Sequence, residues 1–242
     1  MRELSSLDRW TILYAVFAQL SFLWRWPASA AVASHFPVVH AGLVGLAIMA
    51  PRLRRHGPLG EFWASFYPLI LVLALYTEIG LLNRALGFSR DPTVQAWEAA
   101  LFGGQPSRDW IRAWPWPWLS WLLHLGYLSY YLILSASPLG LWFLGQRAGA
   151  RDTVCLIMVG FYLCYAVFLI FPVAGPRYLF PQAENPATAI PVATFTQKLL
   201  NSRAAWGTAF PSSHVAASLV ASLTAWRFSR PLGAVLVPLS VL

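Results

Sequence analysis

The chain has 242 residues, of which 58% are hydrophobic and 11% are charged, and its formal net charge is +8. Soluble domains average about 45–50% apolar and about 25% charged residues, so this composition excludes an ordinary soluble protein and indicates an integral membrane protein. The positive charges are spread over the connecting segments. Membrane topology and anionic lipid explain them there, and they do not indicate nucleic-acid binding.

Long apolar runs predict helices that cross the bilayer. The runs are continuous rather than alternating, which favours helices over a barrel in a medium that requires internal backbone hydrogen bonds. Compared with the roughly 20 residues that a spanning helix needs, they predict six spans and the start of another at Pro231. The predicted fold is therefore all-α, a polytopic transmembrane helix bundle. The spans are expected near residues 10–26, 36–50, 62–83, 118–144, 153–173 and 212–228.

The arginines of the short connections set the expected orientation, because Lys and Arg are enriched in cytoplasmic connections. The tightest basic cluster, "PRLRRHG" at residues 51–57, places that connection in the cytoplasm. By alternation, the basic connections "GQRAGARD" and "WRFSRP" fall on the same side. The two long connections, residues 84–117 and 174–211, then lie on the extracytoplasmic face. We expect a multi-pass protein of the plasma membrane with its chemistry on that face.

The N-terminus allows two interpretations. An apolar run followed by "ASAAVA" at residues 28–33 is similar to a signal peptide with a small-residue cleavage site. Gln19 and the mixed charges of residues 2–9 favour a retained first helix instead. Either interpretation leaves the later topology unchanged.

The first long connection, residues 84–117, contains a short amphipathic segment, Thr93–Phe102, and then a Gly-Gly turn. Indole rings are typical of the membrane–water interface. The tryptophans of this region are therefore interpreted as an interfacial anchor, with ligand stacking as the alternative. They are Trp110, Trp114, Trp116, Trp118 and Trp121.

The second long connection, residues 174–211, is basic. Three cations, Arg177, Lys198 and Arg203, stand against a single acid, Glu184, which gives a formal charge of +2. This charge suits an anionic lipid headgroup, although attraction to bulk anionic lipid is an alternative. Its prolines exclude a continuous helix and predict an extended path over the membrane surface. They stand at positions 176, 181, 186 and 191.

The sequence "FPSSH" at residues 210–214 predicts an anion site where the next helix starts. Free backbone amides and the positive end of the helix dipole attract anions there, and Ser212 and Ser213 add hydroxyl donors. Arg177 can clamp phosphate oxygens with two parallel hydrogen bonds, and His214 can give a proton to a leaving group. Together they indicate phosphoryl transfer. Individually they have simpler explanations: helix capping, an interfacial anchor and a structural histidine.

Two polar positions within spans are further candidates. Glu78 is ionisable in a membrane and so a functional candidate, while an ion pair with Arg84 would account for it structurally. His124, Tyr127 and Tyr131 share one helical face, which indicates either a headgroup pocket or interhelical hydrogen bonds. No metal-ligand spacing occurs among the histidines, so neither a metal nor a cofactor is predicted. The candidate substrate pocket comprises Glu78, His124, Tyr178, Lys198 and Arg203.

Two motifs carry a resemblance to a known family. "GPR" at residues 175–177, followed by "FPSSH", resembles the first two motifs of the type 2 phosphatidic acid phosphatase and vanadium haloperoxidase superfamily, where the second motif is commonly PSGH. "DPTVQAWEAALFGGQPS" and "HLGYLSYY" are similar to segments of its inositol phosphorylceramide synthase-like branch. The resemblance covers roughly residues 60–230.

The resemblance implies a metal-independent mechanism through a phosphohistidine. Arg177 would stabilise the charge of the transferring phosphoryl group, Ser212 and Ser213 would bind its oxygens, and His214 would protonate the leaving group. The nucleophile would be a second histidine in a third motif, [S/G]-R-x5-H-x3-D, oriented by its aspartate. A membrane lipid with a phosphate headgroup would be the substrate. Transfer to water makes a phosphatase, and transfer to an alcohol makes a lipid phosphotransferase.

The sequence departs from the family pattern in two places. The lysine that commonly precedes the first-motif arginine by seven residues would fall at Ile170, so Lys198 or Arg203 would have to supply that contact. No histidine follows His214, and the third motif is absent. The last 12 residues, from Pro231, reach only about 18 Å as a helix, short of a roughly 30 Å hydrocarbon core. The chain is therefore expected to be truncated.

These observations predict N-terminal transmembrane helices over residues 1–60 and a phosphatase-like membrane catalytic domain, incomplete at its C-terminus, over 61–242. The favoured function is a lipid phosphatase or phosphotransferase. The alternative is a catalytically inactive protein that binds or transports lipid phosphates. Haloperoxidase chemistry is disfavoured because the chain has many spans.

Overall fold

The computed structural model describes residues 3–25 and 35–242, and over these ranges every regular element is a helix. One isolated bridge between two connections is the exception. Four of the described helices are long and apolar enough to span a membrane, so the prediction of an all-α integral membrane protein is confirmed. They are α3 (Phe36–Leu53), α4 (Gly57–Leu86), α7 (Pro117–Phe143) and α8 (Arg147–Ile170).

The remaining predicted spans are also helical. They correspond to α1 (Ser6–Trp24), α11 (Ser213–Phe228) and α12 (Arg230–Ser240). Whether each of these three crosses the bilayer stays a prediction. The possible cleavage segment at residues 28–33 lies outside the described residues.

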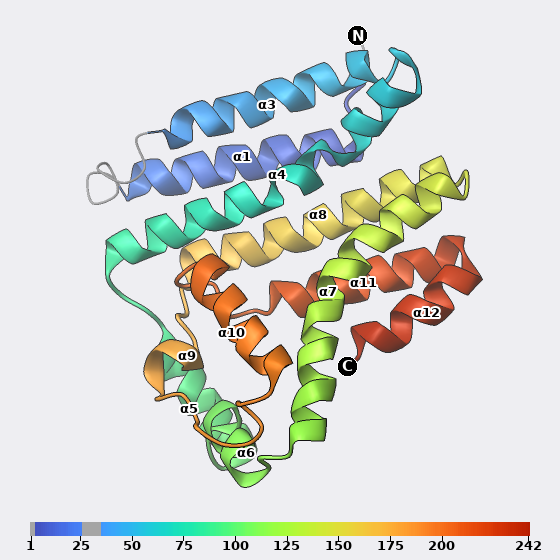
Figure 1. The fold of residues 1–242 in the computed structure, drawn as a ribbon. Helices are drawn as coiled ribbons and strands as arrows, with labels where there is room; N and C mark the ends of the chain where they lie inside the picture. The colour runs from blue at the N-terminus through green and yellow to red at the C-terminus, as the bar shows by residue number, and fades with distance from the viewer. Residues whose placement is uncertain (1–2, 26–34) are drawn as a thin grey trace.

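The centre of the bundle is α8, which contacts α1, α4, α7 and α11 (Figure 1). The face of α11 in this packing carries Ala217, Ala221 and Ala225, all fully buried. Alanines at a spacing of four residues form a flat strip that lets helix backbones approach closely, which is how helices associate in lipid. The start of α11 is thereby held firmly against the rest of the bundle.

Ion pairs gather at the end of the bundle that is predicted to face the cytoplasm. The carboxylate of Asp8, near the start of α1, is fully buried and accepts a 2.6 Å hydrogen bond from Arg54, which follows α3. Glu61 near the start of α4 pairs with both Arg147 and Arg151 of α8, at 2.9 and 2.7 Å. Carboxylates therefore form ion pairs with the arginines of the basic connections at this end.

The two long connections lie together at the other end of the bundle (Figure 1). The segment Thr93–Phe102 is helical and lies within α5 (Asp91–Phe102), and α6 (Pro106–Ala113) follows it. The second connection forms α9 (Pro176–Leu179) and α10 (Pro191–Arg203). The extended path predicted for it is wrong over α10. Pro191 occupies the first helical turn, where its missing N–H costs no hydrogen bond.

We predict that Ala221→Leu lowers the free energy of unfolding by about 1–3 kcal/mol, because the larger side chain overpacks the contact between α11 and the bundle. Thermal unfolding in detergent measures the effect. The control is Leu223→Ala on the same helix, where the side chain is 57% exposed and its loss leaves no cavity. Equal melting temperatures for Ala221→Leu and the wild type would contradict the assigned packing.

Candidate functional site

The two motif-bearing connections are joined by a short backbone pairing. The N–H of Val173 donates to the carbonyl of Gly207 at 3.3 Å, and the N–H of Ala209 donates to the carbonyl of Val173 at 2.9 Å. Val173 stands shortly before Arg177, and Ala209 shortly before Ser212. The pairing therefore brings "GPR" and "FPSSH" side by side, although more than thirty residues separate them.

The first motif is held in place by Asp91 at the start of α5. Its two carboxylate oxygens accept hydrogen bonds from the N–H groups of Ala174 and Gly175, at 2.9 and 2.8 Å, and the side chain is buried. Gly175 has φ +95°, and a Cβ there would lie 2.7 Å from the Cβ of Ala209. Only glycine fits this close approach. Asp91 thus fixes the backbone that presents Arg177.

The second motif is anchored by Asn83 near the end of α4. Its amide nitrogen donates to the carbonyls of Phe168 and Gly207, at 3.0 and 3.2 Å, and its oxygen accepts a hydrogen bond from Arg25 at 3.3 Å. The side chain is fully buried. Sequence reasoning missed this residue. The sequence feature that could have identified it is a polar amide residue close to the end of an apolar run.

Arg177 keeps an unused hydrogen-bond donor. Its Nη2 donates to Asn201 at 2.8 Å, and the guanidinium lies 5.0 Å above the ring centre of Tyr178. Its Nη1 is buried and has no hydrogen-bond partner among the described residues. A buried donor without a partner is unfavourable and suits an anion as its missing partner.

The start of α11 presents the second motif. Ser212 is exposed, and its hydroxyl caps the helix by accepting a hydrogen bond from the N–H of Val215 at 3.3 Å. Ser213 is buried. The Nε2 of His214 lies 3.3 Å from the phenol oxygen of Tyr127. The imidazole also contacts the ring of Tyr130, with 4.3 Å between ring centres. Two tyrosines of α7 therefore orient His214.

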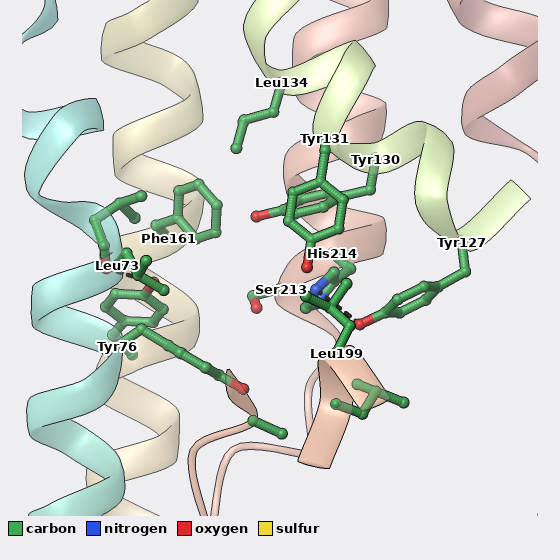
Figure 2. A pocket seen from close by; sticks show the side chains of 14 residues that line it. Leu73, Tyr76, Tyr127, Tyr130, Tyr131, Leu134, Phe161, Leu199, Ser213 and His214 are labelled. Carbon is green, nitrogen blue, oxygen red and sulfur yellow. Dashed lines mark hydrogen bonds between the residues drawn. The ribbon is translucent and has the colours of Figure 1, made fainter. Parts of the chain in front are cut away.

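A cavity of about 250 Å³ opens beside His214 and Ser213, between α4, α7, α8, α10 and α11. Figure 2 shows the imidazole of His214 among the tyrosines that line this space. Most of the wall is apolar, and the phenol groups supply much of its polarity. Lining residues include Leu73, Tyr76, Tyr127, Tyr130, Tyr131, Leu134, Phe161 and Leu199.

Two candidates from the spans do not line this cavity. Glu78 is buried and lies 2.8 Å from Nε2 of His40, so its partner is His40 and not Arg84. His124 bonds within its own helix, with Nδ1 2.8 Å from the carbonyl of Ser120. Both side chains therefore serve contacts between or within helices in this structure, while Tyr127 and Tyr131 of the same predicted face do line the cavity.

The other candidates lie in the second long connection. Tyr178 is exposed on α9, beneath Arg177. Lys198 is exposed on α10. Arg203 is the last residue of α10, and its side chain lies outside the described part of the structure. The guanidinium of Arg177 is partly confined, because Nη2 bonds to Asn201 and Nη1 is buried.

A model of the PAP2 superfamily matches residues 83–242, more than half of the chain. No curated protein and no solved structure matches it. The matched range begins at Asn83 and contains both paired motifs, the tyrosines of α7 and His214. The chain therefore belongs to the PAP2 superfamily.

Proposed function

We propose that this protein is a lipid phosphatase or lipid phosphotransferase that acts on a phosphoester or phosphodiester headgroup at the extracytoplasmic face of the plasma membrane. The observation that carries the proposal is the buried Nη1 of Arg177, which has no hydrogen-bond partner among the described residues and belongs to the connection that pairs with the one leading into α11. Membership of the PAP2 superfamily supports it. Residues 61–242 would form the catalytic domain.

The proposed phosphate site combines three kinds of donor. The guanidinium of Arg177 offers a planar fork that matches two phosphate oxygens. The first backbone amides of α11 have no acceptor within the helix and carry the positive end of its dipole. The hydroxyls of Ser212 and Ser213 complete the set. These donors are fixed before substrate arrives, so charge that develops on the phosphoryl oxygens is stabilised without reorganisation.

The proposed role of His214 is to protonate the alkoxide leaving group. Its Nε2 faces the phenol of Tyr127, which holds the imidazole plane and can yield its place to a substrate oxygen. The cavity beside it receives the lipid part of the substrate. The resemblance to the inositol phosphorylceramide synthase-like branch supports an alcohol as acceptor, in which case the protein is a phosphotransferase. The nucleophilic histidine that this mechanism implies is not found after His214.

Arg177→Gln is predicted to weaken binding of dioctanoyl phosphatidic acid by about 10–100-fold, the value of one or two charge-assisted hydrogen bonds. Binding is measured by tryptophan fluorescence of the purified protein in detergent. Arg90→Gln is the matched control, because it removes the same charge from an exposed position at the same end of the bundle. The phosphate site is wrong if both variants weaken binding equally, or if dioctanoylglycerol binds as tightly as its phosphate.

His214→Ala is predicted to lower the initial rate of phosphate release from dioctanoyl phosphatidic acid by about 10²–10⁴-fold, the usual contribution of general acid catalysis. The assay uses membranes that carry the chain together with a third-motif segment that supplies the nucleophilic histidine. His124→Ala serves as the control, because that histidine lies on a helix of the same bundle and does not line the cavity. Full activity of His214→Ala would exclude the acid role. Binding by the wild-type protein without any turnover would instead support a non-catalytic protein that binds lipid phosphates.

The proposed orientation predicts opposite labelling of two exposed positions. In a background where Cys155 and Cys164 are replaced by alanine, Glu184→Cys should react with a membrane-impermeant maleimide in intact cells. Arg55→Cys should react only after permeabilisation. The positions lie at opposite ends of the bundle, in the second long connection and in the basic cluster before α4. The reverse pattern would place the site in the cytoplasm.

A further inference from the structure

A groove of about 420 Å³ lies between α3 and the start of α4, outside the range that matches the superfamily. Leu46 and Leu53 of α3 line it, together with Leu59 and Trp63 of α4. Leu46, Leu59 and Trp63 are exposed, so the groove is open to the surroundings of the bundle. Its volume is many times the roughly 30 Å³ of one water molecule in the liquid, and its apolar wall offers water few hydrogen bonds. In a bilayer it therefore suits a hydrocarbon chain.

One end of this groove lies at the turn between the two helices. His56, the last residue before α4, lines it there. Leu46 lies two helical turns deeper, about 10 Å along α3 from Leu53. The half-exposed indole of Trp63 is typical of the membrane–water interface. The groove therefore runs from the headgroup layer into the hydrocarbon, as a lipid molecule does.

The headgroup end of the groove carries positive charge that the protein does not neutralise. Of the three arginines at residues 52–55, Arg54 pairs with the buried Asp8. Arg52 and Arg55 are exposed, and their side chains form no hydrogen bond or ion pair within residues 3–25 and 35–242. The nearest acid along α4, Glu61, is already paired with two arginines of α8. An anionic group is therefore the complement of this end of the groove.

The start of α4 adds hydrogen-bond donors beside Arg55. Its first turn has no side-chain cap, and the first N–H groups of a helix have no acceptor within the helix. Those of Gly57 and Leu59 are of this kind, while Pro58 has none. The positive end of the helix dipole favours an anion at the same place. These donors strengthen the complementarity to a phosphate that the arginine and the groove establish.

We propose that an anionic phospholipid binds here, with one acyl chain in the groove between α3 and α4 and its phosphate against Arg55 and the start of α4. In the proposed orientation it is a lipid of the cytoplasmic leaflet, which carries the anionic headgroups. Bulk attraction to a charged surface requires no groove, and a bulk acyl chain requires no arginine. The bound lipid joins α3 to α4 and stabilises the bundle. This site is independent of the proposed catalytic function.

The test measures thermal unfolding of the purified full chain in detergent micelles with increasing mole fractions of phosphatidylglycerol or phosphatidylcholine of the same acyl chains. A ligand that binds the folded protein raises its melting temperature. We expect phosphatidylglycerol to reach half of its maximal effect at about a fivefold lower mole fraction. Arg55→Gln should raise that mole fraction about fivefold, the contribution of one arginine near an anionic surface. The effect of phosphatidylcholine should not change.

The matched control is Arg227→Gln, which removes the same charge from an exposed position near the end of α11, at the same end of the bundle (Figure 1). It should change the half-maximal mole fraction by less than about twofold. Equal weakening by Arg55→Gln and Arg227→Gln would mean bulk attraction and would overturn the proposal. So would equal stabilisation of the wild type by the two lipids.

A second pair of variants tests the groove itself. Leu46→Trp fills it with an indole and should raise the half-maximal mole fraction of phosphatidylglycerol at least about threefold. Leu163→Trp makes the same change on α8, at a position that is 58% exposed and does not line the groove, and should have no effect. If both variants respond to phosphatidylglycerol like the wild type, the acyl chain does not lie in the groove and the proposal is wrong.

Two further arms identify where and how the phosphate binds. Glycerol 3-phosphate carries the anionic group without acyl chains and should leave the melting temperature unchanged. Stabilisation by it equal to that by phosphatidylglycerol would indicate a site for soluble phosphate and exclude the lipid. Arg177→Gln should keep the response to phosphatidylglycerol. Loss of the response in that variant would place the lipid in the proposed phosphate site beside α11, and the groove would be excluded while the proposed function stands.

Discussion

The pairing of Val173 with Gly207 and Ala209 joins two connections that the bundle alone would leave independent. Each connection follows a helix end and would otherwise be free to move over the membrane surface. Once they are paired, the position of Arg177 relative to the start of α11 is set by backbone geometry, which is far stiffer than long side chains. A site that must place an arginine within reach of a helix start depends on this constraint.

Buried side chains hold the pair of connections from two sides. Asp91 binds the backbone of the first motif, and Asn83 binds the carbonyl of Gly207 in the second. Both residues satisfy backbone groups that have no water to bond with at a buried position, where an unmade hydrogen bond is costly. Asp91 acts from the first long connection, and Asn83 acts from α4. In general, residues that contact substrate need support of this kind. It keeps a catalytic arrangement within the narrow geometric tolerance that catalysis requires.

The sequence predicted the helices well because a bilayer requires about 20 apolar residues for each crossing, which is a local and strong signal. The motif residues Ser212 and His214 were also placed correctly at a helix start. The supporting contacts were not predictable in the same way, because Asn83 and Asp91 bond to backbone atoms of distant connections that leave no mark on residue spacing. Glu78 shows the same limit: Arg84 was its nearest cation in sequence, but its partner is His40 on another helix.

The first two helices lie outside the range that matches the superfamily, yet polar contacts fasten them to it. Thr11 of α1 hydrogen-bonds to Tyr162 of α8 inside that range, and Gln19, His40 and Glu78 form a partly buried chain across α1, α3 and α4. Lipid tails are as apolar as leucine, so hydrophobic burial cannot hold such helices together, and hydrogen bonds and close packing must do so. Arg25, directly after α1, bonds to Asn83, which in turn holds the second motif. The N-terminal helices therefore contribute to the support of the site as well as to membrane anchoring.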